Sequence, residues 1–312
     1  MRIALALMLL AACGSKASGG DDGDDGPANG GECDASHDCK DGKVCSITHN
    51  ADGVGECLDA NGDVDNDGLQ NSQDYCNSGP GGQYDEDRDL IGDDCDKCPI
   101  AAPPSTPDPD NDDVESPCDP DPRTPGDKIA LFQGFRAGIP ATYKQTGVWS
   151  ANSGGDAVIT PDPGATATLT TSLPFQSSNI AIFASYRVNS VDATQGRNYV
   201  GLVAKDSRPA SSAHTSCGTQ RSAGADSLSI ENESSAMSMN MTNAFDTASL
   251  YEVTLGVQGL NQFCVIIADS DQLATQATST GEALTEAGQF AQGAAVQFEY
   301  LLVVQRTPTT LD

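Results

Sequence analysis

Residues 63–74 read DVDNDGLQNSQD, and their oxygen-bearing side chains include positions 1, 3, 5, 9 and 12 of the stretch. Gly68 stands at position 6, where a calcium loop of this length makes its sharp turn. Alternate residues of a tightly wound loop point inward, so the carboxylates at positions 1, 3 and 5 converge. Ca²⁺ takes about six to eight oxygen ligands. The spacing therefore predicts a calcium site that also uses the backbone carbonyl at position 7.

The pattern recurs twice along the chain. Residues 85–96 read DEDRDLIGDDCD and residues 108–119 read DPDNDDVESPCD, and the three loops start 22 and 23 residues apart. This is the ligand spacing of an EF-hand-type calcium loop. Leu90 and Asp113 depart from it at position 6, and Ser116 is a weaker ligand than a carboxylate. The predicted ligands, with Leu69, Ile91 and Val114 contributing carbonyls, are Asp63, Asp65, Asp67, Leu69, Asn71 and Asp74; Asp85, Asp87, Asp89, Ile91, Asp93 and Asp96; and Asp108, Asp110, Asp112, Val114, Ser116 and Asp119.

A solvated run of charge is the alternative interpretation of this segment. Three copies in register argue against it, because a spacer has no need to repeat a ligand pattern. The predicted ligand set contains 13 aspartates, which repel one another in a segment with few apolar residues. We therefore expect the segment to be extended without Ca²⁺ and compact with it, so that binding free energy becomes folding free energy. Mg²⁺ is less suitable, because it requires octahedral geometry and retains its waters.

The flanks of the loops, CNSGPGGQY (76–84) and KCPIAAPPSTP (97–107), break helices, so this is not an ordinary EF-hand pair. Together with the DxDxDG-type loops, the Cys98-Pro99 pair and the GDDCD run at 92–96 resemble thrombospondin type 3 repeats over residues 63–121. The resemblance implies that calcium ions replace a hydrophobic core and that disulfides join neighbouring repeats. It also implies the pairs Cys76–Cys95 and Cys98–Cys118.

Charge and cysteine content divide the 312-residue chain into two halves. Residues 21–127 hold 30 acids and 5 bases, for a net charge of −25, whereas residues 128–312 hold 15 acids and 9 bases, for −6. The total of −29 argues against nucleic acid or anionic lipid headgroups as partners, since both are bound through phosphate contacts. Eleven cysteines indicate an oxidising compartment.

The N-terminus predicts a targeting signal. Residues 1–12 begin with Met1-Arg2 and continue as an unbroken apolar run, which fits a signal peptide and is too short to span a bilayer. The run ends in LAAC, which resembles the lipobox of bacterial lipoproteins and implies lipidation at Cys13. Gly14 after the cysteine favours the outer membrane of the cell envelope. An ordinary cleaved signal is the alternative. Residues 13–31 then form the lipid anchor and a flexible linker.

Residues 32–60 predict a small module held by disulfides rather than by a core. Its cysteines at 33, 39, 45 and 57 resemble the short cysteine-rich modules of bacterial surface lipoproteins. Four cysteines allow three pairings, and the sequence does not choose among them. Zinc is the rival interpretation, and the absence of C-x2-C pairs disfavours it. The calcium repeats follow at 61–127.

Residues 128–312 predict an antiparallel β-sandwich, which makes the fold class mainly β. Eleven short strands alternate with turn residues, with 146–150 and 295–305 each expected as one strand and 272–292 as a loop or short helix. Cys217 and Cys264 are the two cysteines that remain, and we expect them to form a disulfide. The FQGF run at 132–135 and the strand at 300–305 resemble concanavalin A-like jelly rolls. In the thrombospondin family such a sandwich also follows the calcium repeats.

The sandwich contains no motif that identifies an active site. Glu231 and Glu233 are expected on one strand face, and paired carboxylates serve glycosidases, but a solvated strand edge is favoured. His214 near Cys217 is no catalytic pair if that cysteine is in a disulfide. Tyr143, Trp149 and Tyr186 are expected in the core rather than in a sugar site, and Met237, Met239 and Met241 in the core rather than on copper.

Three functions remain open from the sequence. The favoured one is a non-enzymatic, calcium-binding surface lipoprotein that presents its sandwich for adhesion or for binding a glycan or surface protein. The second is a secreted enzyme that acts on polysaccharide. The third is a purely structural envelope component. The sequence predicts Ca²⁺ as cofactor and a membrane attachment through the N-terminal lipid.

Overall fold

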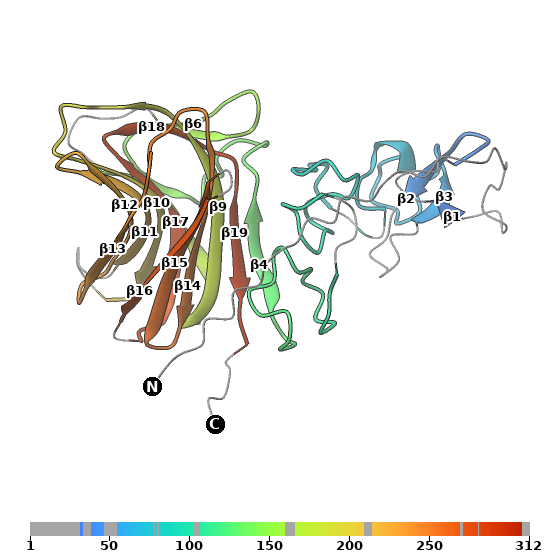
Figure 1. Ribbon diagram of the computed structural model, residues 1–312. Helices are drawn as coiled ribbons and strands as arrows, with labels where there is room; N and C mark the ends of the chain where they lie inside the picture. The colour runs from blue at the N-terminus through green and yellow to red at the C-terminus, as the bar shows by residue number, and fades with distance from the viewer. Residues whose placement is uncertain are drawn as a thin grey trace, which may run out of the picture.

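The computed structural model describes residues 32–33, 39–46, 55–77, 79, 81–102, 107–159, 166–208, 214–268, 271–279 and 281–307. The predicted signal peptide, Cys13 and the linker lie outside the described residues. Figure 1 shows a small N-terminal sheet, a middle segment built of loops and a large two-layered β-structure. Among the described residues, no helix is long and apolar enough to cross a membrane.

The N-terminal module is a three-stranded antiparallel sheet of β1 (Glu32–Cys33), β2 (Lys43–Ser46) and β3 (Gly55–Asp59) in the order β1-β3-β2. The disulfides are Cys33–Cys45 and Cys39–Cys57, which selects one of the three pairings that the sequence left open. The four sulfurs of this module are therefore paired in two disulfides, and none of the four remains as a thiolate ligand for zinc.

Two antiparallel sheets form the sandwich, and the predicted fold class is confirmed. One sheet has the order β13-β12-β11-β10-β17-β8-β5, and the other has the order β16-β15-β14-β9-β18-β7-β6, with β19 between β9 and β4. The bounds are β4 Lys128–Gln133, β5 Lys144–Thr146, β6 Trp149–Ala151, β7 Ala157–Ile159, β8 Thr166–Ser177, β9 Asn179–Val191, β10 Arg197–Asp206, β11 His214–Ser222, β12 Ala225–Glu231, β13 Ala236–Asn240, β14 Leu250–Gln258, β15 Asn261–Ala268, β16 Asp271–Thr278, β17 Leu284–Gln292, β18 Ala294–Phe298 and β19 Leu301–Gln305.

The main hydrophobic core lies between the two sheets. Residues at every second position of β9, among them Ile182 and Tyr186, are fully buried in it, as the two-residue period of a strand requires. The disulfide Cys217–Cys264 joins β11 of one sheet to β15 of the other inside this core, and both cysteines are fully buried. It closes a loop of 47 residues, which is worth about 4 kcal/mol in the loop-entropy model.

A second hydrophobic cluster covers the outer face of the sheet that contains β19. Leu301 and Val303 belong to the main core, whereas Leu302 and Val304 belong to the second cluster, and all four are 0% exposed. This burial on both faces explains why β19 reads as a continuous apolar run rather than an alternating one. The second cluster also contains the disulfide Cys98–Cys118 and Val114 of the repeat segment.

The repeat segment is therefore docked on the sandwich, as Figure 1 shows beside β4 and β19. Two ion pairs join the same parts, Arg136 with Glu86 at 3.0 Å and Arg306 with Asp121 at 3.8 Å. The sequence predicts a repeat segment with little apolar content and gives no sign of this contact. The few apolar side chains of the segment are buried against a part of the chain that is distant in sequence, which spacing within the segment does not reveal.

The prediction of a loop or short helix over 272–292 is wrong. The structure has strands β16 and β17 there. The segment LTEAGQFAQ carries helix-favouring residues, but β17 lies between β10 and β8 and is buried. A side chain at Gly288 would approach the carbonyl oxygen of Leu169 to 2.0 Å, so the small residues permit close strand pairing. Tertiary packing overrides local propensity here.

Two predicted single strands are each divided in the structure. Residues 146–150 split at Gly147, which has φ of 77°, into β5 of one sheet and β6 of the other. Residues 295–305 split into β18 and β19, which pair with successive halves of β9. The sequence analysis also missed β11, which contains only small and polar residues around Cys217.

The aromatic and methionine predictions have different outcomes. Tyr143, Trp149 and Tyr186 are 8%, 7% and 0% exposed, so their assignment to the core is confirmed. The expected burial is wrong for Met237 and Met239, which are 50% and 42% exposed and lie on β13, the end strand of its sheet. Met241 is partly buried and packs against the main core.

Replacing Leu302 by Ala tests the docking of the repeat segment. The side chain is fully buried between the sheet and that segment, so its truncation should cost about 2–5 kcal/mol of unfolding free energy. Urea unfolding of the calcium-loaded protein measures the loss. Leu260→Ala is the matched control, because Leu260 is 60% exposed and should change stability by less than about 0.5 kcal/mol. Equal effects of the two variants would contradict the docked arrangement.

Candidate metal centres

The three acidic loops bring their first three aspartates together in the same way. Carboxylate oxygens from positions 1, 3 and 5 lie within 4.8 Å of one another in each loop. The three sets are Asp63, Asp65 and Asp67; Asp85, Asp87 and Asp89; and Asp108, Asp110 and Asp112. The structure thus assembles the acids that sequence spacing predicted to converge.

The backbone explains how residues so close in sequence converge. Position 4 has positive φ in each loop, at 63° for Asn66, 68° for Arg88 and 59° for Asn111. Position 6 has positive φ as well, including 78° at Leu90 and 72° at Asp113, the two departures from Gly. A side chain at such an angle costs about 1–2 kcal/mol. The winding is therefore kept in all three loops at a steric cost, which arises at position 4 in each loop and also at position 6 in the second and third loops.

A shared hydrogen-bond pattern maintains the winding. The carboxylate at position 1 accepts the N–H of position 6 at 3.1 Å in every loop. The carboxylate at position 5 accepts the N–H of position 7 at 2.8, 2.8 and 3.0 Å. Each acid therefore uses part of its acceptor capacity to shape the loop, which leaves its remaining lone pairs for a cation.

Position 9 separates the third loop from the other two. Asn71 and Asp93 each accept the backbone N–H of position 2, at 3.0 and 2.8 Å. Position 2 of the third loop is Pro109, which has no N–H to donate. Ser116 instead donates its hydroxyl to the carbonyl of Pro107 at 2.5 Å. The hydroxyl of this predicted ligand thus serves the local backbone, unlike its two counterparts.

Position 12 anchors each loop to the next stretch of the chain. One oxygen of Asp74, Asp96 and Asp119 accepts the N–H two residues further on, at 2.8, 2.7 and 2.7 Å. In the first two loops that N–H belongs to Cys76 and Cys98, which start the disulfides Cys76–Cys95 and Cys98–Cys118. These are the pairs implied by the resemblance to thrombospondin type 3 repeats.

Position 7 is apolar in each loop, and in the third loop it packs in a hydrophobic cluster. The side chains of Ile91 and Val114 are 2% and 1% exposed, whereas Leu69 is half-buried. Val114 belongs to the cluster on the outer face of the sandwich. A residue whose carbonyl is a predicted ligand therefore also holds its loop in place through its side chain.

Several buried carboxylate oxygens in the loops have no hydrogen-bond partner. At position 3 they are Oδ2 of Asp65, Oδ2 of Asp87 and both oxygens of Asp110, and at position 12 Oδ2 of Asp119. A buried unpaired carboxylate oxygen is costly unless a cation or donor compensates it. All-oxygen donors in this arrangement suit a hard divalent cation. The residues present fit a metal ion in each loop.

The pKa values of several loop acids are raised, mainly by burial and also by the neighbouring carboxylates. Burial, followed by the neighbouring carboxylates, raises the pKa of Asp87 to about 7. Burial likewise raises the pKa of Asp96 to about 8 and that of Asp119 to about 7, with nearby acids adding to the effect. A bound cation reverses this by favouring the ionised form, so protons and metal compete for these oxygens.

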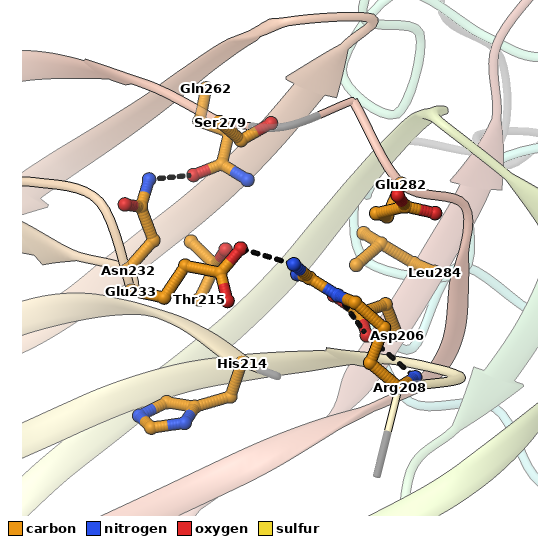
Figure 2. Close-up of a pocket in the computed structure, with 10 residues that line it drawn as sticks. All are labelled: Asp206, Arg208, His214, Thr215, Asn232, Glu233, Gln262, Ser279, Glu282 and Leu284. Atoms are coloured by element: carbon orange, nitrogen blue, oxygen red, sulfur yellow. Dashed lines mark hydrogen bonds and ion pairs between the residues drawn. The ribbon is translucent and has the colours of Figure 1, made fainter. Parts of the chain in front are cut away.

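Glu231 and Glu233, the candidate acids of the sandwich, do not form a carboxylate pair of the expected kind. Glu231 ends β12 and binds Arg197. Glu233 lies beyond the strand and points toward Arg208, as Figure 2 shows. The cavity beside it, about 20 Å³, has room for about one water molecule. Each acid is therefore neutralised by a different arginine, and this cavity is too small for a sugar ring.

His214 lies beside the same cavity, but Cys217 is in a disulfide and is no nucleophile.

Sequence reasoning missed the residues that tie the loops to the sandwich. Asp112 accepts the backbone N–H groups of Gly126 and Asp127, at 2.9 and 2.7 Å, directly before β4. No sequence signal marks these contacts, because both partners are common residues and only the fold brings them together.

Comparison with known proteins assigns no family. No family model matches the chain, and no curated protein does. Among solved structures, the CBM2 module of the evolved Dit of Lactobacillus casei BL23 phage J-1 is similar at 11% identity and a TM-score of 0.43, over 57% of this chain and 96% of that one.

Two further structures are similar to a comparable degree. Lectin II from Ulex europaeus is 8% identical with a TM-score of 0.42, over 58% of this chain and 100% of that one. The β-glucanase of Bacillus licheniformis is 7% identical with a TM-score of 0.42, over 57% and 99%. Likenesses at these values assign no function to the chain.

The metal-free loops should lose stability as the pH rises. The pKa values of Asp87, Asp96 and Asp119 are raised from 3.8 to about 7, 8 and 7, so the folded loops bind more protons than the unfolded chain between about pH 4 and 8. Unfolding free energy therefore falls as pH rises through that range. Amide hydrogen exchange in the presence of a chelator measures this, and calcium should remove the dependence. Greater protection at high pH without metal would contradict the assignment.

Proposed function

We propose that the chain is a non-enzymatic, calcium-binding lipoprotein of a bacterial outer membrane that presents its β-sandwich for adhesion or for binding a surface ligand. The observation that carries the proposal is the equal geometry of the three loops. Each loop repeats the same winding, the same position-1 and position-5 hydrogen bonds and the same convergence of three carboxylates. Chance acidic runs have no reason to share all three features.

Calcium is the cation that this donor set supports best. Each loop offers carboxylates, a backbone carbonyl and, in two loops, a position-9 side chain, which together approach the six to eight oxygens that Ca²⁺ takes. Magnesium requires about 2.0–2.1 Å octahedral contacts and retains water, whereas these ligands come from an irregular loop that offers several carboxylates to one ion. Calcium supplies the positive charge that the converging acids lack, and its binding stabilises the compact segment.

Docking of the repeat segment connects calcium binding in the loops to the position of the sandwich. Val114 of the third loop packs in the outer cluster, and Asp112 accepts the N–H groups that lead into β4. An ion in this loop therefore favours the geometry in which the sandwich is held at a fixed position on its stalk. Such a stiff stalk suits the presentation of a binding domain away from a membrane.

The proposal includes no catalysis by the sandwich. The ion pairs of Glu231 with Arg197 and of Glu233 with Arg208 support this, because each carboxylate has a cationic partner. Both acids would need to be free and on either side of a sugar ring to act as a glycosidase pair. Glycan turnover that disappears in Glu231→Gln or Glu233→Gln would establish the alternative of a polysaccharide-acting enzyme.

Calcium titration of residues 14–312 tests the metal assignment. We expect binding at about 10⁻⁴–10⁻³ M, as in extracellular calcium modules, together with compaction in small-angle scattering. Asp87→Asn should weaken or remove one site, because it deletes a charge at position 3 of the second loop. Glu56→Gln removes the same charge at an exposed position of β3 and should bind as the wild type does. Calorimetry with no heat and scattering with no compaction would overturn the assignment.

Metabolic labelling tests the anchor. Radiolabelled palmitate should label the protein expressed with its full N-terminus, because the residues before Cys13 form the predicted lipobox. Cys13→Ser should abolish the label and release the chain from the membrane fraction. Labelling that persists in Cys13→Ser, or membrane attachment without label, would contradict lipidation at this residue.

A further inference from the structure

A groove lies at the junction of the second loop and the sandwich. Its walls are Gly82, Tyr84, Asp93 and Asp94 of the repeat segment and residues 132–137 after and within the end of β4. The cavity is about 220 Å³. Two parts of the chain that are far apart in sequence therefore build it together, and it exists only while the segment is docked.

The lining has the mixed chemistry of a site for a polyhydroxylated ring. Tyr84 presents a large ring that is 43% exposed, although it lies in a segment with few other aromatic residues. Arg136 offers a guanidinium whose side chain is 28% exposed and whose Nε donates to Glu86 at 3.0 Å. Asp94 adds a carboxylate, and one of its oxygens accepts the N–H of Gly82. One apolar face, cationic donors and anionic acceptors thus meet in one small space.

The volume and the charge of the groove restrict the class of ligand that fits it. Sites for drug-sized ligands span about 300–1,000 Å³, so this cavity of about 220 Å³ suits a single ring. Anionic ligands are disfavoured, because the lining acids Asp93 and Asp94 outnumber the one lining cation, Arg136, which is already paired with Glu86. A neutral sugar ring satisfies both conditions, since its hydroxyls donate and accept and its apolar face can lie on an aromatic ring.

We propose that this groove binds one neutral hexose unit of a surface glycan, with Tyr84 as the stacking platform and Arg136 and Asp94 as hydrogen-bonding partners. The proposal rests on the proposed function and gives its unspecified ligand a chemical class and a place. The groove shares no lining residue with the cavity at Glu233.

The groove is coupled to the second metal centre through the backbone. Tyr84 directly precedes Asp85, the first ligand, and its carbonyl accepts the N–H of Asp93, the position-9 ligand, at 2.8 Å. Asp93 itself also lines the groove. An ion that fixes Asp85 and Asp93 therefore fixes the wall that carries the tyrosine ring. Sugar binding should require calcium for this reason.

Saturation-transfer NMR and calorimetry with free D-glucose, D-galactose, D-mannose and N-acetyl-D-glucosamine test the proposal on the calcium-loaded chain of residues 14–312. We expect at least one of these sugars to bind weakly and reversibly, and a chelator to abolish the signal. Tyr84→Ala should weaken binding by about tenfold or more, as loss of an aromatic anchor does. Ala137→Trp places a bulky side chain at an exposed position of the lining and should block the groove.

Tyr75→Ala is the matched control. Tyr75 is an equally exposed tyrosine of the same segment, at 42%, and it does not line the groove, so sugar binding should remain. Calcium calorimetry and circular dichroism on each variant confirm that the loops and the sandwich are intact. Sugar binding that survives Tyr84→Ala and Ala137→Trp would overturn the groove as the site.

Three other results would also overturn the inference, and they leave different conclusions about the proposed function. Normal calcium binding with no response to any of the four sugars would remove the hexose site and retain the calcium stalk. Binding of N-acetyl-lysine methyl ester in place of the sugars would show that the groove takes a peptide-like ligand instead. Absence of calcium binding would remove the proposed function itself, and the inference that rests on it would fall as well.

Discussion

The converging carboxylates of the three loops are the constraint on which the rest of the chain depends. Their oxygens lie within 4.8 Å of one another in each loop, and like charges at that distance repel by about 1 kcal/mol in water and by several times more where solvent is excluded. The loop hydrogen bonds fix the winding but bring no positive charge. Burial, with neighbouring carboxylates adding to it, raises the pKa values of Asp87 and Asp96 to about 7 and 8. A divalent cation compensates the charge of these acids without their protonation.

The sandwich supplies what the loops cannot, namely an apolar surface. β19 is buried on both faces because its outward residues, Leu302 and Val304, are covered by the Cys98–Cys118 disulfide and Val114. The docking contact is small compared with the main core, and the repulsion within the loops acts against it. If an ion holds the loops compact, ion binding and apolar docking support each other, since a loop that expands would move Val114 out of the cluster.

The sequence predicted those features that depend on short-range spacing. The convergence of the acids at positions 1, 3 and 5 of each loop was visible, because a loop of twelve residues specifies its own winding. Period-two strands such as β9 were visible because one face is buried. Features that depend on contacts distant in sequence were not visible. β17 has helix-favouring residues and becomes a strand only between β10 and β8, Met237 and Met239 are exposed because β13 is an end strand, and Ser116 turns to Pro107 because Pro109 lacks an N–H.

The position of the groove follows from the docking of the repeat segment on the sandwich. A sandwich face that is covered by a second segment loses area for ligand binding, but the seam between the two parts gains a concave surface. At this seam Tyr84, directly before the second loop, and Asp94 within it come from the repeat segment, while Arg136 comes from the stretch that follows β4. An ion bound beside the groove would fix its loop wall through Asp85 and Asp93, and Asp93 also lines the groove. Calcium would then act on recognition by positioning, which couples the folding of the stalk to the formation of the binding surface.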